Sequence, residues 1–151
     1  MSVCKADPPD ALPDHLARWL EAVSRRLHSE LRPQVNDEFS QLRGSHRRIL
    51  QMIPAEGIRV TDLARMAQMT KQALGEFADG LEQSGFVRSQ RDDTDRRVRR
   101  LFRTDLGDRA ADATQRAVAS VEARWRQEIG PGPYDAMKQA LRQLGRDSLR
   151  A

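Results

Sequence analysis

The segment 61–84 constrains the fold of this chain most strongly, because it contains two short stretches with the apolar spacing of a helix, separated by very few residues. Threonine directly before a periodic apolar segment is a typical helix N-cap, so Thr61 and Thr70 each predict the start of a helix. The inward-facing residues are Leu63, Ala64 and Ala67 in the first helix and Ala73, Leu74, Phe77 and Leu81 in the second. Gly85 predicts the end of the second helix, because glycine readily adopts the left-handed backbone conformation that terminates helices. Together these signals predict a helix-turn-helix.

A densely charged run follows at once. Residues 88–102, RSQRDDTDRRVRRLF, contain six arginines and three aspartates. Phe86–Val87 and Val98–Phe102 resemble strands, and the segment Asp92–Asp95 between them is rich in turn-forming residues. These aspartates lack the glycine and the terminal glutamate of a calcium loop, so turn formation explains them better than a cation site. We therefore predict a β-hairpin directly after the helix-turn-helix, which makes a winged helix with an arginine-bearing wing.

Apolar residues at spacings of three and four predict further helices on both sides of this core. The first begins after Pro13 with Asp14 as its N-cap and runs to Pro33, which is expected to kink or divide it. A shorter helix at 45–53 turns Ile49, Leu50 and Ile53 inward and ends at Pro54. A long helix after Asp105 ends at the GPGP segment 130–133, and a last helix begins at Tyr134. The apolar stripes of the first, third and last of these helices include Leu16, Trp19, Leu20, Val23, Leu27, Leu31, Val121, Trp125, Ile129, Met137, Leu141 and Leu144.

The chain has few other residues with which to cover these long stripes. An intersubunit helical bundle is the simplest way to bury them, so we expect a homodimer. The predicted organisation is a flexible arm at 1–11, a helical dimerisation region formed by 12–42 and 105–151, and a winged helix-turn-helix at 43–104. The fold class is thus mainly α with a small β-hairpin wing.

Charge and cysteine content narrow the partners and the compartment. Residues 41–110 carry 14 Lys and Arg against 10 Asp and Glu, which suits a polyanionic partner. No apolar run approaches the ~18 residues of a membrane span, and no signal-peptide pattern opens the chain. The single Cys4 cannot form an internal disulfide, and only Lys5 beside it would lower its pKa, so we expect an inert exposed thiol in a cytoplasmic protein.

Three stretches of the core follow a known pattern. The chain has LEQSGFVRS at 81–89, DDTDRR at 92–97 and RTDLG at 103–107. Over roughly residues 42–109 it therefore resembles the MarR (multiple antibiotic resistance regulator) family, whose usual pattern is LExxGxVxR, then DxxDRR, then LTxxG. The resemblance implies a homodimeric transcription regulator, more often a repressor than an activator, that binds a pseudo-palindromic operator and often responds to a small ligand.

The resemblance also implies roles for matching residues. Asp95 and Arg97 fall on the Asp-x-Arg of the wing, where the arginine enters the minor groove and the aspartate helps to orient it. Thr104 and Gly107 match the cap and the glycine after the second wing strand. Arg103 departs from the family by replacing an apolar residue, and Glu76 replaces a basic residue of the recognition helix.

Residue chemistry predicts the DNA-reading set independently. The first turns of a recognition helix read base edges, and this helix presents Thr70, Lys71, Gln72, Gly75 and Glu76 there. Glutamine pairs with adenine, whereas glutamate accepts from cytosine N4 but is repelled by phosphates, so the role of Glu76 stays open. Gly75 allows close backbone approach. Wing arginines reach phosphates or a narrow minor groove, and the expected set is Arg91, Arg96, Arg97 and Arg99 beside Asp95.

The effector, metal and enzyme hypotheses receive less support. In the resembling family the ligand pocket lies between the dimerisation helices and the core, so Trp19, Phe39 and His46 are candidates, although ordinary packing explains each more simply. The spacing of His15, His28 and His46 suits no metal, and we expect no cofactor. No phosphate-cradling loop, nucleophile elbow or metal-base helix indicates an enzyme.

The sequence thus predicts a ligand-responsive repressor that binds specific double-stranded DNA as a homodimer. The alternative is a winged-helix module that binds another protein without sequence-specific DNA binding. Four wing arginines beside a polar recognition turn favour DNA, because a protein-binding module has no need of them.

Overall fold

Six helices and a three-stranded sheet make up the part of the chain that the computed structural model describes, residues 14–35, 39, 42–92 and 94–146. The predicted N-terminal arm and Cys4 lie outside these ranges. In chain order the elements are α1 (Leu16–Val35), α2 (Gly44–Gln51), β1 (Ile58–Arg59), α3 (Val60–Ala67), α4 (Lys71–Gln83), β2 (Val87–Arg91), β3 (Arg99–Arg103), α5 (Asp105–Ile129) and α6 (Pro131–Gly145). The mainly α fold with a β-hairpin wing is confirmed. None of the described helices is long and apolar enough to cross a membrane.

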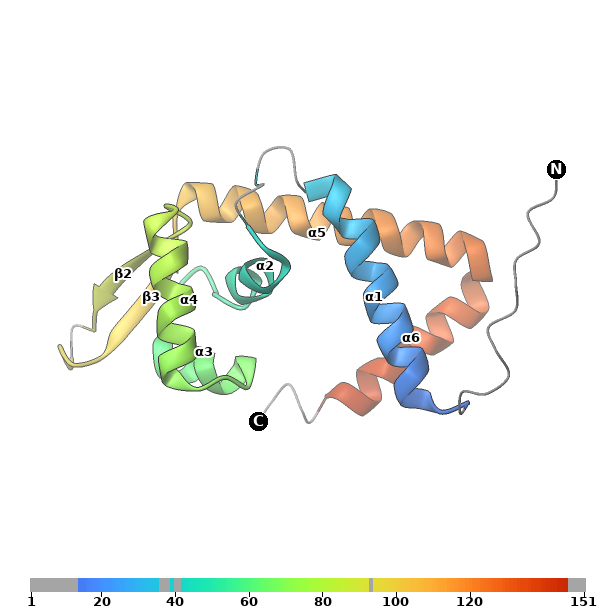
Figure 1. Cartoon of the computed structure of the whole chain (residues 1–151), viewed down its shortest axis with the longest axis horizontal. Helices are drawn as coiled ribbons and strands as arrows, with labels where there is room; N and C mark the ends of the chain where they lie inside the picture. Colours follow the sequence, from blue (N-terminus) through green and yellow to red (C-terminus); the bar gives the residue numbers. More distant parts are fainter. Residues whose placement is uncertain (1–13, 36–38, 40–41, 93, 147–151) are drawn as a thin grey trace.

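The long helix α5 connects two parts of the molecule. The elements α2 to β3 form a winged lobe around one end of α5, while α1 and α6 lie toward its other end (Figure 1). The core of the winged lobe is formed by apolar side chains from its helices and sheet together with α5. Its most deeply buried large residues are Leu50, Ile53, Leu63, Leu74, Leu81, Val87 and Leu101. The inward residues predicted for α2 and α3 lie in this core, as do Leu74 and Leu81 of α4. Phe77 packs against the core, whereas Ala73 is only partly buried and lies outside it.

Two of the four predicted N-caps are confirmed. The Thr70 hydroxyl accepts a hydrogen bond from the Ala73 N–H at 3.1 Å, and the Thr104 hydroxyl accepts one from Gly107 at 3.1 Å. The prediction for Thr61 is wrong, because α3 begins at Val60 with Arg59 as its N-cap. The cause is β1, whose pairing of Arg59 with Arg100 of β3 holds the chain extended up to the residue before Val60.

The predicted cap at Asp14 is also wrong. Helix α1 begins at Leu16, and the N–H of Arg18 donates to Nδ1 of His15 at 3.3 Å. The Asp14 carboxylate accepts instead from the indole N–H of Trp19. Pro33 does not divide the helix, which continues through it to Val35.

The sheet has the strand order β1-β3-β2 and is antiparallel throughout. Strand β1 was not predicted, since two residues are too few to show the alternation of a strand. The hairpin itself is confirmed, with Val87 paired to Arg103 and Arg91 paired to Arg99. The stop after α4 is confirmed as well. Gly85 has φ +77°, and the Phe86 N–H then reaches back to the Leu81 carbonyl at 2.9 Å.

The hairpin and α5 meet at one crowded junction. The Phe86 carbonyl accepts the Thr104 N–H at 3.1 Å, and the Thr104 hydroxyl donates to the Gly85 carbonyl. A β-carbon at position 107 would lie 2.0 Å from the Phe86 carbonyl oxygen, so only glycine fits there. Beside this junction Arg103, the departure from the family pattern, forms an ion pair with Asp108 at 2.7 Å.

Polar contacts attach α1 to α5. Arg26 pairs with Glu30 at 2.7 Å and with Glu128, and its guanidinium stacks over the Trp125 ring at 5.1 Å. Arg124 adds a contact to the Glu30 carboxylate at 3.0 Å. The hydrogen bond from Arg26 holds the pKa of Glu30 below its usual value. These contacts orient α1 across the far half of α5.

Helix α6 begins earlier than predicted. The chain turns at Gly130, with φ +88°, and both following prolines lie in the first turn of α6. Proline is compatible with a first helical turn, because the N–H groups there have no partner within the helix. Gly130, the first residue of the GPGP segment, is therefore the one residue between the end of α5 and the start of α6.

His46 of α2 packs under α4 without a full set of hydrogen bonds. Its ring lies 5.0 Å from the Phe77 ring, measured between centroids. Its Nδ1 is buried and has no hydrogen-bond partner among the described residues. Burial lowers the pKa of the His46 imidazole, and nearby Arg43 lowers it further. The fold thus favours a neutral His46.

We predict that His46 makes the fold acid-sensitive between about pH 6.5, where a free histidine titrates, and its lower folded pKa. In that window the unfolded chain binds a proton that the folded chain excludes, so the free energy of unfolding falls as the pH falls. Urea unfolding at pH 7.5 and 5.5 measures this loss, which should shrink in His46→Gln. His28→Gln, at an exposed position of α1, should keep the loss of the unmodified protein. Equal pH dependence in all three proteins would contradict the assignment.

Candidate nucleic-acid interface

The first two turns of α4 present polar side chains to solvent. The Thr70 cap fixes where the helix begins, and burial of Leu74, Ala78 and Leu81 fixes how it is rotated. Residues at 72 and 76 then lie on the opposite side of the helix. The residues predicted to read bases are all solvent-accessible, with Gly75 partly buried and the others exposed: Thr70, Lys71, Gln72, Gly75 and Glu76.

The tip of the wing presents arginines. Arg96 and Arg97 are exposed there, and the Asp95 carboxylate accepts the backbone N–H of Arg97 at 2.9 Å. Asp95 therefore fixes the backbone that carries Arg97 rather than its guanidinium. Arg91, also exposed, donates to the Arg96 carbonyl at 3.2 Å. The aspartate and the arginines of the tip are thus neighbours in one turn.

Asp92 has an internal function in the same turn. It is 5% exposed, and its carboxylate accepts from the hydroxyl and the N–H of Thr94. It also faces Arg59 at 3.4 Å and Arg100 at 3.6 Å. The Thr94 hydrogen bonds and the Arg59 charge hold the pKa of Asp92 far below its ordinary value. The acid thereby ties the wing turn to the sheet, in agreement with turn formation.

Arg99 differs from the other predicted wing arginines. Its Nε donates to the Ser89 hydroxyl at 2.7 Å, and its two terminal nitrogens donate to Asp79 and Glu82, each at 2.8 Å. The guanidinium therefore turns toward α4 instead of outward. Sequence reasoning could not show this, because it depends on how β3 packs against a helix 20 residues earlier.

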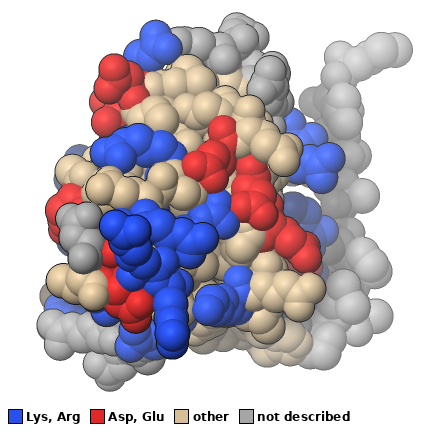
Figure 2. Space-filling view, turned by 90° about the vertical axis from the view of Figure 1, so that its left-hand side faces the viewer, with Lys and Arg blue, Asp and Glu red and all other residues tan. Residues whose placement is uncertain are grey.

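Two arginines outside the predicted set lie on the outer face of the sheet. Arg88 stacks over the Phe102 ring at 4.5 Å, and Arg100 approaches the same ring at 5.9 Å. Arg88 and Phe102 are cross-strand partners, so the alternation of strand residues was the signal that could have grouped them. The wing-bearing end of the molecule, seen face on, carries a dense group of basic side chains (Figure 2).

The three effector candidates lie in different surroundings. Phe39 is 2% exposed and packs edge to face against Phe86, which makes it a core residue. His46 packs against Phe77, as described above. Trp19 is 50% exposed on α1. Trp19 is therefore the most exposed of the three candidates.

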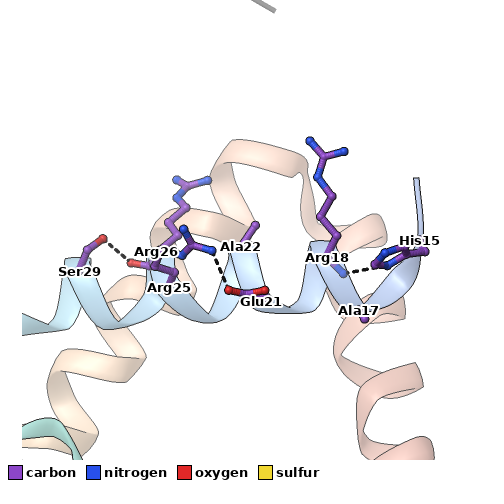
Figure 3. Close-up of a pocket in the computed structure, with 8 residues that line it drawn as sticks. All are labelled: His15, Ala17, Arg18, Glu21, Ala22, Arg25, Arg26 and Ser29. Atoms are coloured by element: carbon purple, nitrogen blue, oxygen red, sulfur yellow. Dashed lines mark hydrogen bonds and ion pairs between the residues drawn. The ribbon is translucent and has the colours of Figure 1, made fainter. Parts of the chain in front are cut away.

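An open groove of about 860 Å³ runs along α1. Its described lining residues are His15, which directly precedes this helix, and residues of the helix itself, and Arg18 and Arg26 project to the same side of it (Figure 3). Glu21 and Arg25 form an ion pair at 2.9 Å within the lining. The groove is thus the outer surface of one helix, and the effector candidates are not among its described lining residues.

Comparisons with known proteins agree on the fold. The chain superimposes on the crystal structure of MarR with a TM-score of 0.79 at 19% identity, covering 96% of this chain and 97% of that one. It is similar to the transcriptional repressor CouR bound to a 23-mer DNA duplex, with a TM-score of 0.75 at 23% identity over 86% and 92% of the two chains. CouR from Rhodococcus jostii RHA1 bound to p-coumaroyl-CoA gives 0.70 at 20% identity over 89% and 94%.

No curated protein sequence matches the chain. The sequence model of the MarR family does match, over residues 48–98, which run from α2 through the helix-turn-helix to the wing tip. This segment contains two of the three stretches that carried the resemblance, those at 81–89 and 92–97. The winged helix of this chain therefore matches the MarR family model, and the fold is that of the solved MarR structure.

Proposed function

We propose that the chain binds specific double-stranded DNA as a homodimer and acts as a ligand-responsive repressor. The observation that carries the proposal is the pairing, on one lobe, of an exposed polar recognition turn with an exposed arginine-bearing wing tip. The proposed contacts are Thr70, Lys71, Gln72, Gly75 and Glu76 in the major groove and Arg91, Asp95, Arg96 and Arg97 at the minor groove or the phosphates. The family is one of transcription regulators, and we assign no enzymatic activity.

The exposed apolar surface of the flanking helices supports the homodimer. Leu27 and Leu31 of α1 are partly buried, whereas the N-terminal half of its stripe is open. The exposed large apolar residues on α1, α5 and α6 are Leu16, Trp19, Leu20, Val23, Ile129, Leu141 and Leu144. A second copy would cover them, with 12–42 and 105–151 as the dimerisation region and 43–104 as the DNA-binding domain. The two half-sites would then lie about 34–36 Å apart.

Ligand response is proposed from the family and from one similar structure. CouR has been seen with both DNA and p-coumaroyl-CoA. A small molecule would release this chain from DNA only by binding the DNA-free arrangement of the lobes more tightly than the bound one. Of the predicted candidates, Trp19 is the most exposed in the described arrangement.

The first test is Arg97→Ala, compared with Arg116→Ala on an exposed side of α5. Both variants lose one positive charge, but only Arg97 lies at the proposed interface. Operator binding by Arg97→Ala should weaken by ~1–3 kcal/mol, the scale of a specific arginine contact. The slope of log affinity against log salt should fall by about 0.9 if the contact is to phosphate.

Fluorescence anisotropy with a labelled operator and with random-sequence DNA, over a salt series, measures both quantities. Arg116→Ala should match the unmodified protein. Equal affinity of the unmodified protein for operator and random DNA would instead support the alternative of a protein-binding module. Unchanged operator binding by Arg97→Ala would remove the wing tip from the interface.

Gln72→Ala should relax base preference rather than abolish binding. Glutamine reads adenine through two hydrogen bonds that alanine cannot make. Selection from a randomised operator library reports the preference at each position, and one position per half-site should lose its adenine bias. Gln83→Ala, at the exposed other end of α4, is the matched control and should preserve the full preference. An identical selected sequence for Gln72→Ala would exclude Gln72 from base reading.

Gly75 is a glycine that the protein itself does not require. A β-carbon at this position would have no heavy atom within 4 Å, and the residue lies inside a helix. Gly75→Ala should therefore raise the free energy of unfolding by about 1 kcal/mol. If the backbone here approaches DNA closely, the same change should weaken operator binding by about 1–3 kcal/mol, the scale of one mismatched base pair.

Gly80 in the same helix provides the control. A β-carbon there would lie at an ordinary 3.8 Å from Nε2 of His46, so Gly80→Ala should also stabilise the fold. Because position 80 belongs to the later half of α4, operator affinity should stay unchanged. Stabilisation by Gly75→Ala with full operator affinity would show that Gly75 serves no close approach.

A further inference from the structure

Four side chains connect the wing to the recognition helix. They are Asp79 and Glu82 of α4, Ser89 of β2 and Arg99 of β3, and we call them the wing brace. Glu82 lies at its centre, because its carboxylate accepts the N–H and the hydroxyl of Ser89, each at 2.7 Å, and the Arg99 guanidinium at 2.8 Å. Arg99 in turn donates to Ser89 at 2.7 Å and to Asp79 at 2.8 Å.

The brace is a tight, charge-assisted network rather than a loose surface ion pair. Each of the three guanidinium nitrogens of Arg99 donates to a different side chain, which fixes the plane of the group. Burial alone would raise the pKa of Glu82, but the hydrogen bonds from Ser89 and Arg99 outweigh it and lower the pKa. The Glu82 carboxylate therefore remains ionised at neutral pH.

The position of the brace along the hairpin allows it to restrain the wing tip. At the base, Phe86 and Val87 are buried in the core, whereas at the far end Arg91 and Arg97 are exposed. Ser89 lies between the two regions, and Arg99 pairs with Arg91 at the last register of the ladder before the tip. Their contacts to α4 thus restrain the part of the hairpin that projects from the core.

We propose that the wing brace fixes the distance between the arginines of the wing tip and the recognition turn of α4. The recognition turn can then contact the major groove while the wing tip contacts the minor groove or the phosphates of the same duplex. The inference rests on the proposed function. Arg99 is then a positioning residue, and it takes no part in direct DNA contact. Asp79 and Glu82 lie on α4 within two turns of Gly75, so the same helix carries the reading surface and the anchor of the wing.

The brace needs an arginine rather than a positive charge alone. A lysine is a single charged point and cannot donate in three fixed directions, whereas the planar guanidinium can. Arg99→Lys therefore separates the two possible roles of this residue. If Arg99 touched phosphate, lysine would largely replace it; if Arg99 positions the wing, lysine would fail although the charge is kept.

The experiment measures affinity for the operator and for random-sequence DNA across a salt series, with folding checked by circular dichroism and thermal melting. Arg99→Lys and Glu82→Gln should each weaken operator binding by about tenfold, within the usual range for coupling between sites. For Arg99→Lys, affinity for random DNA and the salt slope should stay those of the unmodified protein. Arg116→Lys, at the exposed position of α5 used above, should leave operator binding unchanged.

A double variant tests whether the two residues act as a unit. Arg99→Gln combined with Glu82→Gln should weaken operator binding no more than either change alone, because the first change already removes the link. Full operator affinity in Arg99→Lys, or additive losses in the double variant, would overturn the positioning role. Absence of any operator preference in the unmodified protein would instead refute the proposed function, so the two failures are distinguishable.

Discussion

The contact between the start of the hairpin and the start of α5 determines how the parts of this molecule are arranged. There the Phe86 carbonyl accepts the Thr104 N–H, and the Thr104 hydroxyl donates to the Gly85 carbonyl. A β-carbon at position 107 would lie 2.0 Å from the Phe86 carbonyl oxygen, so α5 can approach the hairpin this closely only at a glycine. Four elements end or begin at this point: α4, β2, β3 and α5. The recognition helix, the wing and the helix leading to the distal part are consequently fixed relative to one another by backbone groups.

The acidic residues of the winged lobe complement this backbone constraint. Asp92 accepts hydrogen bonds within the wing turn and forms ion pairs with two arginines of the sheet. Asp95 accepts a backbone N–H of the tip. Asp79 and Glu82 form ion pairs with Arg99. Each acid thereby binds a group inside the lobe, and Arg96 and Arg97 remain exposed at the tip. A run that mixes aspartate with arginine thus produces a surface on which the positive charge is outermost.

Local signals predicted the local structure well. Thr70, Gly85 and Thr104 each act through hydrogen bonds within a few residues, so their roles could be inferred before the fold was known. Thr61 failed because a two-residue strand, visible only through its pairing with β3, sets the start of α3. Arg99 was assigned outward for a similar reason. Its partners Asp79 and Glu82 are far away in sequence, and strand alternation alone does not reveal which helix a strand face meets.

Helix α5 runs without interruption for 25 residues, about 37 Å at the rise of an α-helix. It contacts the hairpin near its first turn and α1 and α6 in its distal half. A continuous helix of this length moves as one rigid element, so a rotation at one end also moves the other end. A tilt of a few degrees, imposed where α1 and α6 pack, therefore displaces the winged lobe by several ångströms and changes its separation from any second lobe held on the same axis.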